Sequence, residues 1–235
     1  MNNYGNQFQM PSQVGVRPVA RLSAGFLTQA FTWMFAGLLL TAGVSYLVQG
    51  NERIYSLARD LFLPAILVEL GVVFAIGLLI KRISALVALG LFFAYAALNG
   101  LTIGLVVSAY APASVATAFL SAAAMFGAAA VYGAVTKRSL ASMGGFLSMA
   151  LVGLVVAMLL NLFFQNSMLS LLLSVIGVVI FTALTAYDTQ RIAQGDYAAG
   201  LGSMEKGAVF GALRLYLDFI NLFLMLLRLF GSGRR

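Results

Sequence analysis

The chain alternates between long uncharged apolar runs and short polar segments that contain most of its Lys and Arg. Three runs have no charged side chain: residues 22–51, 83–136 and 139–187. Because a membrane-spanning helix needs about 20 mainly apolar residues, the first run has room for one span and each of the others for two. Turn-forming residues divide the longer runs at 111–112 (Ala-Pro) and at 165–167 (Gln-Asn-Ser).

Two further apolar stretches complete a set of seven predicted spans. A membrane barrel would require strands that alternate polar and apolar residues over about 10 positions, and this chain has no such alternation. We therefore predict an all-α polytopic membrane protein with seven transmembrane helices. The predicted spans are residues 27–48, 61–80, 83–109, 113–135, 144–164, 168–187 and 207–230.

The chain divides into three predicted parts. Residues 1–22 form a polar N-terminal tail that we expect to be flexible, residues 23–231 the seven-helix domain, and residues 232–235 a basic C-terminal tail. The N-terminal tail lacks the basic-then-apolar order of a cleaved signal peptide, so we expect the first span to be retained.

Composition supports a membrane protein and narrows its chemistry. The chain is 62% hydrophobic and 9% charged, with a mean hydropathy of +0.99, whereas soluble domains have about 25% charged residues. The net charge of +7 arises from short clusters between apolar runs, so we predict no nucleic-acid partner. With no Cys and no His, a metal would need oxygen donors, which favours hard cations such as Ca²⁺. We predict no cofactor and no resident metal.

The distribution of Lys and Arg predicts the orientation. The N-terminal tail and the loops after the second, fourth and sixth spans together have eight basic residues, and the opposite side has five. Because positive charge favours the cytoplasmic side, we predict a cytoplasmic N-terminus and an outside C-terminus. The basic C-terminus opposes this orientation.

Three of the seven acidic residues lie within or at the ends of apolar spans: Glu69, Asp188 and Asp218. A charged side chain at the centre of a bilayer helix costs roughly 2.5–3.5 kcal/mol. A charged residue is retained in a span where a partner offsets this cost or where a function uses the charge. These three carboxyl groups are therefore the candidate functional residues.

Two interpretations fit the aspartates. In the first, Arg214 neutralises Asp218 one helical turn away, and Asp188 is a helix-end residue paired with Arg191. In the second, Asp188 and Asp218 face each other and share one proton, because two adjacent carboxylates cannot both ionise cheaply. The shared proton would then hold the last two spans together, and its loss would add repulsion that opens them.

Glu69 lies in the middle of the second span, with no basic residue three or four positions away. It needs a partner on another helix, a water-filled cavity or a proton, and both Arg214 and Asn99 are candidate partners. It is either part of an ion path or a structural contact. No phosphate-binding loop and no nucleophile with a His base occur, and neither aspartate has a Gly-x-Gly-Asp setting, so we predict no enzymatic activity.

Two segments resemble the Bax inhibitor-1 (TMBIM) family, in its bacterial inner-membrane branch. They are residues 181–192 (FTALTAYDTQRI) and 212–224 (ALRLYLDFINLFL). The resemblance implies a multi-pass protein of the bacterial inner membrane, with the seventh span as a central helix surrounded by the other six.

The resemblance also implies a pH-sensitive Ca²⁺ leak. In it, Asp188 and Asp218 would form the pH sensor and gate, and Glu69 would lie on the ion path with Asn99. It places Arg82, at the end of the second span, beside the aspartates, with Arg214 and Asn221 as further polar neighbours. The lipid bilayer, Ca²⁺ and H⁺ are then the partners. The alternative is a modulator that transports nothing and binds a membrane AAA protease complex or its substrates.

Overall fold

The structure is a computed structural model that describes residues 19–231, with side chains from residue 25 onward. The predicted tails, and with them the Arg residues at 17, 21, 234 and 235, lie outside the residues whose side chains are described.

The described chain is built of helices joined by short turns, with no β-strand between residues 19 and 231. Seven of these helices (α1, α3, α4, α5, α6, α7 and α9) are long and apolar enough to cross a membrane, which confirms the seven predicted spans. In chain order the elements are α1 (Val19–Gly50), α2 (Glu52–Asp60), α3 (Phe62–Leu79), α4 (Ala85–Ser108), α5 (Pro112–Val135), the 3₁₀ turn η1 (Ala141–Met143), α6 (Gly144–Phe164), α7 (Ser167–Ala193), α8 (Asp196–Leu201) and α9 (Met204–Phe230).

Polar residues in the turns begin and end the helices. Ser84, Asn166 and Ser203 each accept a hydrogen bond from the backbone N–H three residues later, at 3.2, 3.0 and 3.3 Å. Such capping satisfies an amide that has no partner within the helix. Gln165 ends α6 in a left-handed conformation, with φ of 48°. The turns predicted at 111–112 and 165–167 therefore lie at helix boundaries in the structure.

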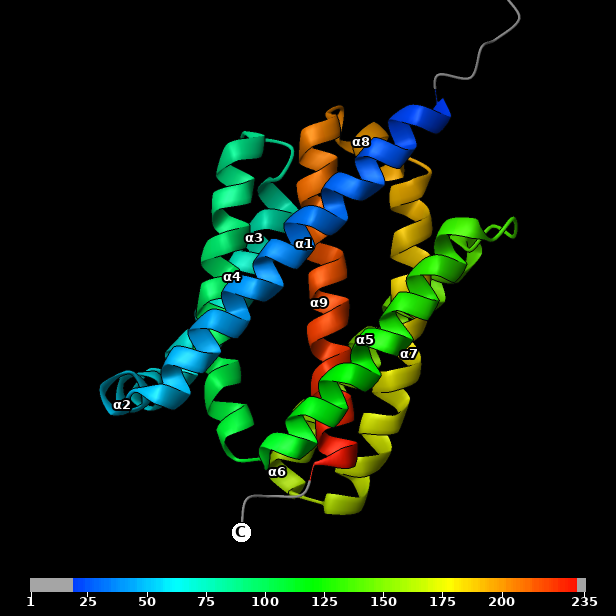
Figure 1. Cartoon of the computed structure of the whole chain (residues 1–235). Coiled ribbons are helices and arrows are strands. Elements are labelled where there is room, and N and C mark those ends of the chain that lie inside the picture. Colours follow the sequence, from blue (N-terminus) through cyan, green and yellow to red (C-terminus); the bar gives the residue numbers. More distant parts are fainter. Residues whose placement is uncertain (1–18, 232–235) are drawn as a thin grey trace, which may run out of the picture.

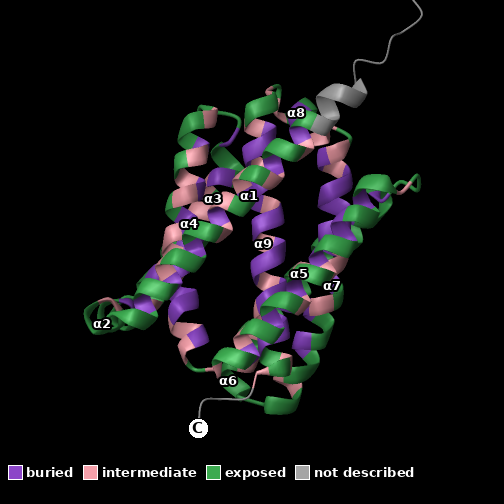
Figure 2. Ribbon diagram, viewed as in Figure 1, coloured by how far each residue is buried: buried purple, intermediate pink, exposed green. Residues whose placement is uncertain are grey.

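The last helix, α9, is the most buried of the seven spans (Figures 1 and 2). In the most apolar 18-residue stretch of α9, 72% of the residues are buried, compared with 11% in the corresponding stretch of α6. It packs against α1, α4, α5, α7 and α8, whereas α3 packs on α4 and α6 packs on α7. These contacts do not confirm the expectation that all six other spans surround α9, because α3 and α6 pack mainly on α4 and α7 and form an outer layer.

Small residues allow α1 and α4 to approach closely. A Cβ atom added at Gly100 would lie 2.6 Å from Val44 Cβ, and one at Gly104 would lie 2.7 Å from Val48 Cβ. Helix pairs in membranes rely on such small residues because van der Waals contact has to replace the hydrophobic effect. This packing holds α1 and α4 together alongside α9.

The sequence interpretation missed two short helices and part of a long one. Helix α2 is a nine-residue polar segment between the first two spans, and α8 lies between Gly195 and Gly202, whose φ values are 75° and 64°. Helix α7 continues to Ala193, beyond the predicted end of its span at Tyr187. Asp188 therefore lies inside α7 and not at its end.

Candidate functional site: a buried aspartate pair and a second acidic cluster

The packing of α7 on α9 brings the two aspartates together. A Cβ atom at Gly211 of α9 would lie 2.9 Å from the side chain of Ile192 in α7. The two helices run in opposite directions from this contact, so one turn further into the bundle α7 reaches Asp188 while α9 reaches Arg214. Asp218 follows on the next turn of α9. Both aspartates are buried, with 0% and 5% of their surface exposed.

Asp188 has two partners from different elements. Its Oδ1 accepts a hydrogen bond of 2.5 Å from the hydroxyl of Tyr197 in α8. Its Oδ2 lies 3.5 Å from the Nε of Arg214 in α9. Arg214 therefore forms its ion pair with Asp188, and the first interpretation, in which Arg214 pairs with Asp218, does not describe the structure.

The carboxyl group of Asp218 is buried close enough to that of Asp188 for the two to interact electrostatically. Within the described residues, neither Asp188 Oδ2 nor Asp218 Oδ2 accepts a hydrogen bond, since the Arg214 contact is an ion pair without hydrogen-bond geometry. Two carboxylate oxygens repel each other unless one group carries a proton. With one shared proton, the two aspartates and Arg214 together have zero net charge, whereas without it a net negative charge is left buried.

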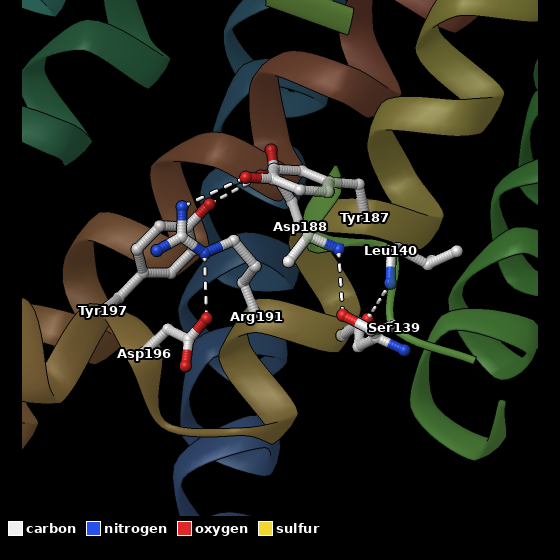
Figure 3. A network of polar contacts seen from close by, with 9 residues as sticks. Ser139, Leu140, Tyr187, Asp188, Arg191, Asp196 and Tyr197 are labelled. Carbon is white, nitrogen blue, oxygen red and sulfur yellow. Dashed lines mark hydrogen bonds and ion pairs between the residues drawn. The ribbon is translucent and has the colours of Figure 1, made fainter. Parts of the chain in front are cut away.

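Arg191 contacts Asp196 and Tyr187 instead of Asp188 (Figure 3). Its Nε lies 3.0 Å from Asp196 Oδ2, and its Nη1 donates to the hydroxyl of Tyr187 at 3.1 Å. Its guanidinium also lies over the ring of Tyr197, 5.1 Å from the centroid. The expected pairing of Arg191 with Asp188 is therefore replaced by contacts that hold α8 against the end of α7.

Tyr197 contacts the aspartate pair from α8, through its hydrogen bond to Asp188. Its side chain is buried, and its hydroxyl points at Asp188 in Figure 3. Burial, together with the neighbouring charge of Asp188, raises the pKa of the Tyr197 hydroxyl above its ordinary value. The phenol therefore keeps its proton throughout the physiological range and remains a donor to the carboxylate.

Glu69 belongs to a second cluster, between α3 and α4. Its Oε2 accepts a hydrogen bond from Asn99 Nδ2 at 3.1 Å, and its Oε1 accepts one from the hydroxyl of Thr102 at 2.9 Å. The network continues to α9 and α1, because the Tyr216 hydroxyl donates to Asn99 Oδ1 at 3.1 Å and lies 2.6 Å from the hydroxyl of Thr41. Of the two partners proposed for Glu69, the structure selects Asn99.

Two of the expected polar neighbours, Arg82 and Asn221, make no hydrogen bond or ion pair with the aspartates in the described part of the chain. Arg82 is exposed in the turn after α3, so Arg214 and not Arg82 supplies the positive charge beside Asp188. Asn221 donates to the backbone carbonyl of Leu217 at 2.8 Å and lines a separate cavity next to α6. Of the three residues assigned to that neighbourhood, the structure places Arg214 there.

Four polar residues of these clusters were missed by the sequence interpretation: Thr41, Thr102, Tyr197 and Tyr216. Thr and Tyr are common in apolar spans, so their presence alone is no signal. For Tyr197 a signal did exist, because the two glycines on either side of its segment, Gly195 and Gly202, indicate a structured turn.

The fold and the site define a class: a seven-span helical membrane protein with two buried aspartates, one on its most buried helix, α9, and one on α7. The family model described as "Inhibitor of apoptosis-promoting Bax1" matches residues 23–235. The chain belongs to this family, the Bax inhibitor-1 family.

Individual relatives match over almost the whole chain. An uncharacterised protein of Deinococcus radiodurans is 48% identical over 210 residues, which cover 89% of this chain and 90% of that protein. The inner membrane protein YbhL of Escherichia coli K12 is 40% identical over 225 residues, covering 93% of this chain and 96% of YbhL. An uncharacterised protein of Borreliella burgdorferi is 40% identical over 214 residues, which cover 89% of this chain and 92% of that protein. None of these names states an enzymatic activity.

Proposed function

We propose that the protein is a pH-sensitive cation leak of the bacterial inner membrane, with Ca²⁺ as the transported ion and the Asp188–Asp218 pair as its gate. The observation that carries the proposal is the pair of buried carboxyl oxygens without a hydrogen-bond partner on α7 and α9, two spans that pack closely against each other. A buried group that needs a proton for its contact is a natural pH switch.

The switch has a definite sign. At low pH the shared proton joins Asp188 to Asp218, and the cluster with Arg214 has no net charge. As pH rises and the proton leaves, one uncompensated negative charge remains between α7 and α9, and repulsion favours their separation. Arg191 and Asp196 neutralise each other nearby, so they add no net charge to this balance.

Glu69 provides the second element of the proposed path. Its carboxylate accepts hydrogen bonds from the amide nitrogen of Asn99 and the hydroxyl of Thr102, and carboxylate and hydroxyl oxygens are ligands that hard divalent cations prefer. The cluster also connects α3 of the outer layer to the buried α9, through Asn99 and Tyr216. A movement of α9 at the aspartate pair would therefore reach Glu69 through the hydrogen bonds of Tyr216 and Asn99.

Reconstitution of the protein alone into vesicles that enclose a Ca²⁺-sensitive dye tests this function. We expect Ca²⁺ uptake that depends on pH and exceeds that of empty vesicles. Uptake equal to that of empty vesicles across the pH range would refute the leak. That result would favour the alternative, a modulator that binds a membrane protease or its substrates.

A further inference from the structure

A crevice lies between α6, α7 and α9, towards the end of the bundle where α9 finishes. Its volume is about 370 Å³, which falls within the range of ligand pockets. The crevice exists because α6 packs on α7 and has no comparable backbone contact with α9. Since α6 is also the least buried span, the crevice borders the lipid-facing side of the bundle.

The lining of this crevice is polar near the ends of the helices and mainly apolar further in. Asn161, Ser170 and Arg228 lie near the helix ends, and Leu154, Phe181 and Met225 lie further in. Asn221 is the polar residue at the inner end, where its amide donates to the backbone of its own helix. Along α7 the wall from Ser170 to Phe181 is about 16 Å long at the rise of an α-helix. That is about half the ~30 Å hydrocarbon thickness of a bilayer. The crevice therefore has the length and polarity of one lipid leaflet.

Arg228 is the ionisable side chain of this lining. It lies in the last turn of α9 and is exposed. Among the described side chains, the ion pairs of Arg59, Arg191 and Arg214 occupy Asp60, Asp196 and Asp188, and none involves Arg228. The crevice thus has an unpaired cation at its mouth and no carboxylate in its lining. An anionic ligand with a long apolar chain fits both features.

We propose that this crevice binds an anionic phospholipid, with the phosphate on Arg228 and one acyl chain along the apolar wall between α6 and α9. The side-chain amide of Asn161 and the hydroxyl of Ser170 lie at the depth of the glycerol and ester groups. Binding would join the loosely packed α6 to the buried helix. The inference does not depend on ion transport.

The test compares phosphatidylglycerol with phosphatidylcholine of the same acyl chains, by native mass spectrometry of the purified full-length protein. We expect phosphatidylglycerol to bind more tightly. Arg228→Gln should reduce its affinity about five- to ten-fold, the order of one basic side chain acting on a lipid phosphate at a membrane surface. Arg228→Lys should retain most of the preference, because it keeps the charge.

Matched controls separate a site from general attraction. Arg53, an exposed cation of α2 at the same end of the bundle, lies outside the crevice, so Arg53→Gln should leave the affinity unchanged. Glycerophosphoglycerol, which has the headgroup without acyl chains, should not displace the lipid. The proposal is overturned if Arg228→Gln binds like the wild type, if Arg53→Gln loses as much affinity, or if the soluble headgroup competes.

Discussion

Replacing Tyr197 by Phe removes the single hydroxyl that caps the aspartate pair. The ring of Phe keeps the edge-to-face contact with Phe210, whose centroid lies 5.2 Å away, so packing is preserved. The change deletes the 2.5 Å hydrogen bond to Asp188 Oδ1. The other contact of Asp188, the ion pair with Arg214 at 3.5 Å, remains in place.

The expected magnitude follows from the type of bond that is lost. A hydrogen bond to a charged group contributes about 1.5–3 kcal/mol, and a change of one pH unit in a proton equilibrium corresponds to about 1.36 kcal/mol. Because Tyr197 donates to the charged form of Asp188, its removal favours the protonated pair. The pH midpoint of cation flux should therefore rise by roughly 1–2 pH units.

The assay is the vesicle flux measurement, repeated at closely spaced pH values for the wild type and Tyr197→Phe. Tyr46→Phe serves as the matched control, because Tyr46 is 75% exposed on α1 and far along the chain from α8. An unchanged midpoint in Tyr197→Phe, or a downward shift, would refute the reasoning that places Tyr197 as a donor to the charged carboxylate.

Three further predictions concern other parts of the molecule. Glu69→Gln keeps the shape of the side chain and removes its charge, so cation flux should fall while the protein still folds; unchanged flux would make Glu69 a structural contact only. Gly104→Val places new methyl groups against Val48, where even a Cβ atom would lie 2.7 Å away, and should destabilise the fold by about 1–3 kcal/mol in an unfolding assay; no loss would mean that α1 can shift freely. A reporter that is active only in the cytoplasm should be inactive when fused after Arg235, and its activity would reverse the predicted orientation.

The sequence predicted the spans well because each one satisfies its backbone internally and must be apolar throughout its length. The polar turns at 111–112 and 165–167 were sufficient to divide the long runs. The short helices α2 and α8 were missed because they lie outside the apolar runs that mark a span. Hydropathy also ended the sixth span at the first charged residue, although α7 continues past Asp188.

The candidate site was only partly predictable, because pairing between helices depends on register and rotation. Sequence spacing favours Asp218 as the partner of Arg214, because the two lie one helical turn apart on the same helix. The packing at Gly211 instead brings Arg214 to Asp188 of α7. Glu69 could be identified as a residue in need of a partner, and Asn99 was one of two candidates. Its second partner, Thr102, had no distinguishing feature in the sequence.

The central claim is that Asp188 and Asp218 act as one proton-sharing unit. Its most direct test is the pH dependence of Ca²⁺ flux in vesicles containing Asp188→Asn, Asp218→Asn or both. Each single replacement should abolish the pH response, and the double replacement should resemble the singles, because residues that act as a unit are not additive. A pH response that persists in Asp188→Asn would contradict the account.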